Sequence, residues 1–160
     1  MTRRTLVLIR HAKSDWSGDE PDHERPLAKR GERQAPEAGA WIAANLELDL
    51  AVVSTAARAH ATWRLVAAQL DRQPAVAFDD RVYAASSRTL LEIVRELPDT
   101  ATTVAMVGHN PGLEGLVTLL TGQWQPMPTS AVAVIDLEGR WADAGAGASL
   151  RTAGRPPGHT

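Results

Sequence analysis

The feature that most constrains the fold is an uninterrupted apolar run at residues 6–9, LVLI, which stops at Arg10 and His11. A strand with one face in water alternates apolar and polar residues, whereas a run without alternation is typical of a strand buried on both faces. Parallel sheets that are covered by helices on both sides contain strands of this kind. The run therefore predicts an α/β fold in which residues 6–9 form a buried strand.

The same kind of run recurs along the chain. Short apolar stretches lie at residues 50–53, 76–78 and 103–107, and each has the length of a strand. A further stretch at residues 131–137 alternates enough to be an edge or antiparallel strand. These stretches predict a mostly parallel sheet of five or six strands.

Helical patterns separate the predicted strands. A helix is expected from about residue 29 to residue 46. Apolar residues at helical spacing predict two more helices, over residues 63–70 and 90–97. Ser86 and Ser87 are the candidates for the N-cap of the second of these.

The clearest helix start follows the run at residues 103–107. Asn110 can cap this helix, Pro111 takes the first helical position, and Gly122 offers a left-handed stop. With this helix the order is strand and helix repeated four times, followed by a final strand. The order predicts a three-layer α/β/α sandwich with right-handed crossovers.

The length of the chain fits one domain. Its 160 residues, 44% of them hydrophobic and 22% charged, are enough to bury a core. We assign residues 1–144 to this single domain. Residues 145–160 are rich in Gly and Pro and have few large apolar side chains, so we expect a flexible, dispensable tail.

Composition removes several classes of function. With 17 basic and 19 acidic side chains and no block of like charges, we expect no nucleic-acid partner and no membrane partner. The chain has no cysteine, which excludes disulfide scaffolds, thiolate zinc sites, iron–sulfur clusters and cysteine nucleophiles. The apolar run near the start is too short for a signal peptide or a membrane span, so a cytoplasmic protein is expected.

Arginine and histidine follow three of the predicted strands. Arg10 and His11 come after the first strand, Arg58 comes shortly after the second, and His109 follows the fourth. Ligands of parallel α/β sheets bind at the carboxyl ends of the strands, so these four side chains are expected at one edge. Arginine matches phosphoryl oxygens in a bidentate manner, and histidine can attack phosphorus or move a proton at neutral pH. This set indicates phosphoryl transfer through histidine.

Other chemistries fit the same residues poorly. A metal hydrolase needs a ligand cluster, but no HxH or HExxH pair occurs and the arginines would repel a cation. A serine hydrolase of the G-x-S-x-G type lacks its motif. A nucleotide-binding loop needs glycines after the first strand, where this chain has RHAKSD. We therefore expect no metal and no cofactor.

Four segments in this order, LVLIRHAKSDW, DHERPLAKRG, VVSTAARA and VGHNPGLEGL, resemble the histidine phosphatase (phosphoglycerate mutase-like) superfamily. The resemblance is greatest to its short branch, the SixA-type phosphohistidine phosphatases, and it covers roughly residues 5–137. Arg10 and His11 fill the first two positions of the RHG motif of the superfamily. The resemblance implies a cofactor-independent phosphatase with a phosphoglycerate mutase-like fold and a covalent phosphohistidine intermediate.

The resemblance also implies a role for each site residue. His11 corresponds to the nucleophile, Arg10 and Arg58 to the arginines that hold the phosphoryl oxygens, and His109 to the second histidine beside the phosphate. Positive charge on the arginines, with His109 adding to it if protonated, would offset the charge of the transferred group. Ser17 lies where many relatives have a phosphate-binding asparagine. Phosphate or sulfate is expected to bind in this site.

The general acid is where the chain departs from the family. Many relatives have a glutamate after the third strand, whereas residues 78–83 read FDDRVY and Asp80 is the nearest positional match. Alternatively, Tyr83 supplies the proton, or no residue does. An alkoxide leaving group needs a proton donor, but a protonated imidazole leaves readily from a P–N bond. A missing acid therefore favours phosphohistidine on a protein as the substrate.

Two other functions stay open from the sequence. One is a phosphatase of small phosphoesters, such as a sugar phosphate or a nucleotide. The other is a catalytically silent domain that binds phosphate. Outside the four central residues, Arg25 either corresponds to a feature of the family or braces its loop to Asp22 or Glu24. Trp16 either lines the pocket or anchors the loop.

Overall fold

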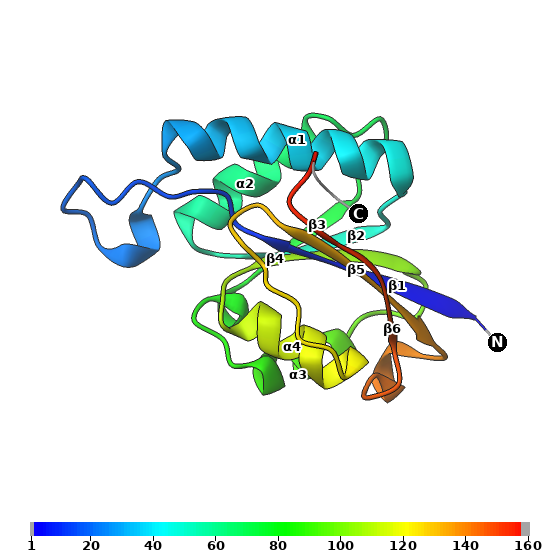
Figure 1. The fold of residues 1–160 in the computed structure, drawn as a ribbon. Coiled ribbons are helices and arrows are strands. Elements are labelled where there is room, and N and C mark those ends of the chain that lie inside the picture. The colour runs from blue at the N-terminus through cyan, green and yellow to red at the C-terminus, as the bar shows by residue number, and fades with distance from the viewer. Residues whose placement is uncertain (1, 158–160) are drawn as a thin grey trace.

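The computed structural model describes residues 2–157, which fold into one six-stranded sheet with helices on both faces (Figure 1). The strand order across the sheet is β3-β2-β4-β1-β5-β6. Neighbours pair in parallel from β3 to β1, whereas β5 and β6 are antiparallel to their neighbours. The strands are β1 Arg3–Arg10, β2 Leu50–Ser54, β3 Ala75–Asp79, β4 Thr103–Gly108, β5 Val132–Glu138 and β6 Ser149–Gly154.

Strand β1 is buried on both faces, as its uninterrupted apolar run predicts. Leu6 and Leu8 pack into the core on one face of the sheet, and Val7 and Ile9 pack into the core on the other. All four side chains have 0% exposure. The expected three-layer α/β/α sandwich with a mostly parallel sheet is confirmed.

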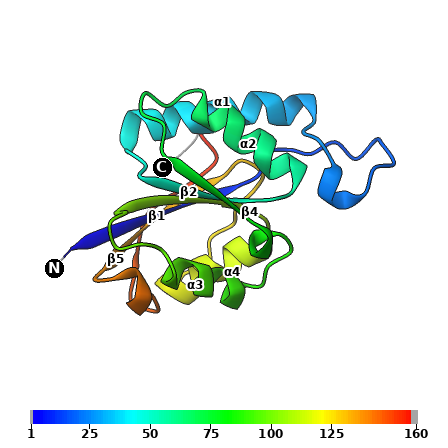
Figure 2. The ribbon, with the colours of Figure 1, turned by 180° about the vertical axis from the view of Figure 1, so that it is seen from behind.

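Two pairs of helices form the outer layers. Helices α1 (Lys29–Asn45) and α2 (Ala57–Ala67) cover one face, and α3 (Ser87–Arg95) and α4 (Gly112–Thr121) cover the other, as the two opposite views show (Figures 1 and 2). Three short 3-10 helices complete the described chain: η1 Asp22–Glu24, η2 Asp80–Val82 and η3 Trp141–Asp143. None of the helices within residues 2–157 has the length and apolar character that a membrane crossing requires.

Local signals in the sequence set several helix ends. The hydroxyl of Ser86 accepts a hydrogen bond from the backbone N–H of Thr89 at 3.2 Å and so caps α3. Gly122 ends α4 in the left-handed conformation, with φ of 74°. The start of α4 lies one position later than predicted, because Pro111 takes the N-cap position while Asn110 accepts from the N–H of Glu114 at 3.3 Å.

The C-terminal segment corrects one expectation. Residues 145–160 were expected to form a flexible tail, but Ser149–Gly154 is strand β6, paired antiparallel with β5. Leu150 and Ala153 pack against the core, and Arg151 forms an ion pair with Asp136 at 2.6 Å. The sheet therefore continues past the predicted domain boundary at residue 144, and residues 158–160 of the expected tail lie outside the described part of the chain.

Candidate active site

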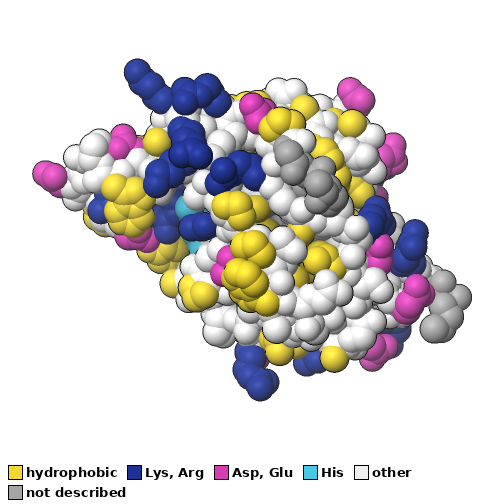
Figure 3. All heavy atoms as spheres, in the orientation of Figure 1, with side chains coloured by type: hydrophobic (Ala, Val, Ile, Leu, Met, Phe, Trp, Pro, Cys, Tyr) yellow, Lys and Arg dark blue, Asp and Glu magenta, His cyan; other side chains and the backbone are white. Residues whose placement is uncertain are grey.

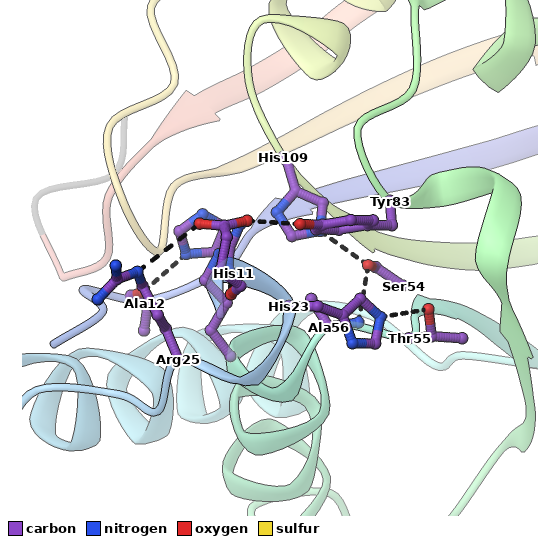
Figure 4. Close-up of polar contacts among 11 residues, drawn as sticks. His11, Ala12, His23, Arg25, Ser54, Thr55, Ala56, Tyr83 and His109 are labelled. Atoms are coloured by element: carbon purple, nitrogen blue, oxygen red, sulfur yellow. Dashed lines mark hydrogen bonds and ion pairs between the residues drawn. The ribbon is translucent and has the colours of Figure 1, made fainter. Parts of the chain in front are cut away.

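Two histidines face each other at the carboxyl edge of the sheet. Arg10 at the end of β1 pairs in register with Gly108 at the end of β4, so His11 and His109 leave neighbouring strands side by side. Their ring centroids are 5.0 Å apart, with an interplanar angle of 49° (Figure 4). The two residues are only 7% and 9% exposed. The parallel pairing of β1 and β4 thus places two imidazoles in one mostly buried site.

The surroundings of His11 hold its ring neutral and oriented. Its Nδ1 lies 2.8 Å from the carbonyl oxygen of Ala12, which can only accept, so Nδ1 carries the proton and Nε2 has a free lone pair. Burial lowers the pKa of His11 to about 4, and the positive charges of Arg58 and Arg10 act in the same direction. At neutral pH, His11 is therefore in the form that can attack phosphorus through Nε2.

His109 is held by a serine at the end of β2. Its Nε2 lies 2.7 Å from the hydroxyl oxygen of Ser54, which is 0% exposed and also accepts the N–H of Ala56 at 3.2 Å (Figure 4). Among the described residues, the Ser54 hydroxyl has no acceptor other than His109 Nε2, so the hydroxyl donates to it. The proton of a neutral His109 is then on Nδ1, which is buried and has no partner in the described chain.

The charge state of His109, which the sequence leaves open, follows from its burial. Burial, followed by the charges of His11 and Arg58, lowers the pKa of His109 to about 3. The ring is therefore neutral at neutral pH in the unliganded site. It offers an N–H donor to an anion rather than a full positive charge.

Two arginines supply the positive charge of the site. Arg58, in the first turn of α2, is 7% exposed and donates from Nη1 to the carbonyl oxygen of Asp22 at 2.8 Å. Arg10 donates from Nη1 to the carbonyl oxygen of Met127 at 3.0 Å. The Nε atoms of both arginines are buried and have no hydrogen-bond partner within residues 2–157. Such free donors beside two neutral imidazoles fit a bound phosphoryl group.

The carboxylate of Asp22 is a site residue that the sequence analysis did not assign. It accepts from the Tyr83 hydroxyl at 2.6 Å and from Arg58 Nη2 at 3.1 Å. The Tyr83 hydrogen bond is the main cause that lowers the pKa of Asp22, and Arg58 adds to it. The Tyr83 ring meets His109 edge-on, with centroids 5.6 Å apart. Asp22 thus fixes the position of Arg58 and links it to a residue that contacts His109.

The loop around Asp22 is braced as its sequence suggested. Arg25 lies 3.9 Å from a carboxylate oxygen of Asp22 and 3.8 Å from one of Glu20, and within residues 2–157 it forms no ion pair with Glu24, the other alternative. Its guanidinium also lies over the ring of Trp16, 4.1 Å from the centroid, and Trp16 is 58% exposed. Trp16 therefore holds this loop through Arg25.

Asp80 and Ser17 make their contacts elsewhere. Asp80 accepts from the Thr55 hydroxyl at 2.7 Å, and that hydroxyl oxygen in turn accepts from His23 Nε2 at 3.0 Å. Ser17 donates from its backbone N and its hydroxyl to Asp15, at 2.9 and 2.7 Å, and is exposed. Within the described chain, no hydrogen bond joins either residue to His11 or His109. The structure thus brings together Arg10, His11, Arg58 and His109 without joining Ser17 or Asp80 directly to them.

The chain departs from the RHG motif at its third position, where Ala12 stands. Ala12 is 0% exposed, and its N–H donates to the Thr62 hydroxyl of α2 at 2.9 Å. That hydroxyl donates to the carbonyl oxygen of Arg58 at 2.7 Å. This chain of hydrogen bonds ties the loop of His11 to the helix that carries Arg58.

A metal has no ligand set of the usual kind in residues 2–157. No group of three or more His, Asp or Glu side chains is arranged there to hold an ion. Charges of Arg58, Arg10 and Asp22 act on both histidines, the two arginines lowering and Asp22 raising the pKa of each ring.

Comparison with known proteins agrees with this geometry. The signature of the histidine phosphatase superfamily (branch 1) matches residues 6–83. A Nakamurella multipartita protein provisionally named phosphohistidine phosphatase SixA is 30% identical, covers 98% of each chain and has a TM-score of 0.87. An uncharacterized protein of Mycobacterium tuberculosis is 37% identical over 147 residues, which is 84% of this chain and 90% of its own. A SixA protein histidine phosphatase in complex with tungstate has the same fold, with 20% identity, 95% and 97% coverage and a TM-score of 0.82. The chain belongs to the histidine phosphatase superfamily.

Proposed function

We propose that the protein is a phosphatase that transfers a phosphoryl group to His11 and then to water, with phosphohistidine on a protein as its preferred substrate. One observation carries the proposal. The neutral His11 ring lies 5.0 Å from the His109 ring, and the charges of Arg58 and Arg10 act on both. A nucleophile beside fixed cationic donors is the arrangement that phosphoryl transfer requires.

The first step forms the covalent intermediate. Nε2 of His11 attacks phosphorus in line, a new P–N bond forms, and the bond from phosphorus to the leaving imidazole breaks. Arg10 and Arg58 offset the charge on the phosphoryl oxygens, and the Nδ1–H of His109 donates to one of them. The leaving group departs as neutral imidazole when the substrate phosphohistidine already carries a proton on its other ring nitrogen.

The second step returns the enzyme to its starting state. Water attacks phosphorus, the P–N bond to His11 breaks, and the Nε2 lone pair is restored. The protons of the attacking water leave with inorganic phosphate or with the solvent. Because Nδ1 of His11 stays bonded to the Ala12 carbonyl, the same tautomer is ready for the next turnover.

The lack of a carboxylic acid placed to donate a proton among the described residues supports a substrate with a P–N bond. An alkyl phosphate needs an acid to protonate its leaving oxygen. Asp22 is ionised, because the hydrogen bonds from Tyr83 and Arg58 lower its pKa. Asp80 bonds to Thr55 and has no hydrogen bond to either site histidine within the described chain. A substrate with an imidazole leaving group needs neither carboxyl.

One feature favours a second candidate function, a phosphatase of small phosphoesters. A groove of about 680 Å³ lies beside the site, and its lining includes His23, Thr55, Phe78 and His60. Thr55 and His23 also form the hydrogen-bonded chain to Asp80, so the body of a small molecule in this groove would lie close to that carboxyl. Under this alternative, Asp80 would be the general acid.

A substrate panel separates the two functions from each other and from a silent domain. Phosphate release is measured on a phosphohistidine peptide, p-nitrophenyl phosphate, sugar phosphates and a nucleotide, with a chelator present throughout. We expect the peptide to be the best substrate and His11→Ala to abolish release. His60→Ala, a histidine of the groove that contacts neither site histidine, should keep near-normal release from the peptide. A preference for small esters would favour the second candidate, and no release from any substrate would favour a silent phosphate-binding domain.

A further inference from the structure

The C-terminal end of β6 reaches the same sheet edge as the site. Ile9 of β1 pairs in register with Val132 of β5, and Val132 pairs with Gly154 of β6. The residue after Gly154 is Arg155, so it lies level with Arg10, two strands away. Adjacent strands are about 4.8 Å apart, which places the two backbones roughly 10 Å from each other.

The side chain of Arg155 is fixed against the segment beside the nucleophile. Its Nε donates to the carbonyl oxygen of Thr129 at 2.8 Å, and its Nη2 lies 3.3 Å from the Thr129 hydroxyl. The N–H of the next residue, Ser130, is shared between the carbonyl oxygens of Arg10 at 3.1 Å and His11 at 3.0 Å. The guanidinium of Arg155 is thus held at a defined place beside the site rather than free in solvent.

The positive charge of Arg155 is not paired with a carboxylate in the described part of the chain. Two other arginines of the C-terminal half form ion pairs, Arg140 with Asp99 and Arg151 with Asp136. No carboxylate in residues 2–157 forms an ion pair with Arg155. Its charge also acts on Arg10, whose pKa is lowered mainly by burial and further by Arg155. An anchored guanidinium without a carboxylate suits an anion that comes from outside the chain.

The surface around the site carries the same sign of charge. Figure 3 shows Lys and Arg side chains gathered around the opening in which histidine is visible. Two of the site's guanidinium groups, Arg10 and Arg58, have buried donors that suit the transferred phosphoryl group. Arg155 starts about 10 Å from Arg10 along the sheet, and its guanidinium is held on Thr129 rather than on either histidine.

We propose that Arg155 binds a second anionic group of the substrate, a carboxylate of an Asp or Glu that flanks the phosphohistidine, while Arg10 and Arg58 bind the phosphoryl group. This inference rests on the proposed phosphohistidine substrate. It gives the C-terminal segment a part in substrate selection. It predicts a preference for acidic sequences around the phosphohistidine.

The test compares two phosphohistidine peptides that differ only in having Glu or Gln on either side. We expect the wild type to favour the Glu peptide in kcat/KM by about 3- to 10-fold, the range of a partly desolvated ion pair. Arg155→Gln is expected to lose this preference and to keep its rates on the Gln peptide and on p-nitrophenyl phosphate. The matched control is Arg3→Gln, which removes the same charge at the other end of β1, about 23 Å from Arg10.

Two results would overturn the inference. One is a wild type that treats both peptides alike. The other is an Arg155→Gln variant that loses activity equally on both peptides and on p-nitrophenyl phosphate, which indicates a structural role. Thermal unfolding of the variant detects that structural role independently.

Failure of the proposed function gives a different result. In that case the wild type releases no phosphate from either peptide. Binding of stable phosphonate analogues of the two peptides then decides the role of Arg155, because binding needs no turnover. Tighter binding of the Glu analogue, lost in Arg155→Gln, would support the inference, and equal binding would contradict it.

Discussion

The hydroxyl of Ser54 lies 2.7 Å from Nε2 of His109, and this hydrogen bond sets which nitrogen of the histidine carries its proton. Because the Ser54 hydroxyl has no other acceptor among the described residues, its proton goes to His109. The Nδ1–H of His109 is left to face the site, where an anion can accept it. A serine at the end of one strand thus controls a donor on the next strand but contacts no substrate.

Replacing Ser54 tests this relationship. Ser54→Ala frees the tautomer of His109 and is expected to lower kcat about 5- to 30-fold with a smaller change in KM, a loss of about 1–2 kcal/mol. Nitrogen NMR of the His109 ring should show a shift away from the Nδ1–H form. Ser86→Ala, which removes the cap of α3, is the matched control and should affect stability but not the tautomer. An unchanged tautomer in Ser54→Ala would refute the assignment.

The pH profile tests the protonation state of His11. Its pKa is lowered to about 4, so the nucleophile loses its free lone pair only when the pH falls through that value. We expect kcat/KM for p-nitrophenyl phosphate to be independent of the His11 ionisation from pH 8 to about pH 5.5 and to fall below it. If His11 had an ordinary pKa of about 6.5, the enzyme would already have lost half of its activity at a pH of about 6.5. A midpoint near pH 6.5 that NMR titration traces to His11 would contradict the account.

The Asp22 carboxylate should affect activity because it holds the Arg58 guanidinium in position. Asp22→Asn removes the charge that holds the guanidinium and is expected to lower kcat/KM about 10-fold, or about 1.4 kcal/mol. Tyr83→Phe should have a smaller effect in the same direction, and the double variant should be less impaired than the product of the two predicts. Asp19→Asn, in the same loop, is the matched control. Equal losses in Asp19→Asn and Asp22→Asn would point to the loop as a whole instead.

Asp80 distinguishes the two substrate classes. Asp80→Asn removes the ionisable carboxyl but keeps an oxygen that can accept from the Thr55 hydroxyl. It should change the rate on a phosphohistidine peptide by less than about 3-fold, because imidazole needs no acid. The same variant is assayed on a sugar phosphate. A loss of 10-fold or more on the sugar phosphate, together with a wild-type preference for it, would favour the small-ester function and make Asp80 its acid.

Local sequence patterns predict much of this fold. The run at residues 6–9 identifies β1 because burial on both faces leaves no polar position in it. Ser86 and Gly122 mark helix ends because capping depends on side chains and backbone within one turn. The convergence of His11 and His109 follows from the parallel order of their strands.

The parts that the sequence did not reveal depend on contacts between distant segments. Strand β6 is an edge strand with half-buried positions, so its apolar pattern is weak and its pairing depends on the free edge of β5. The ion pair of Asp22 with Arg58 spans 36 positions of the chain, and no local rule selects Asp22 over Asp19 or Glu20. Arg155 lies in a segment whose composition indicates mobility, and only the register of β6 places it near Arg10.

The central claim is that His11 carries the phosphoryl group, and trapping the phosphoenzyme tests it most directly. Wild-type protein is mixed with a radiolabelled phosphohistidine peptide, quenched in alkali within one turnover, and mapped by mass spectrometry, because a phosphohistidine survives alkali. The account predicts a label on His11 that acid removes, that is absent in His11→Ala and that is present in His60→Ala. Turnover without label on His11, or label on another residue of a fully active enzyme, would contradict the account.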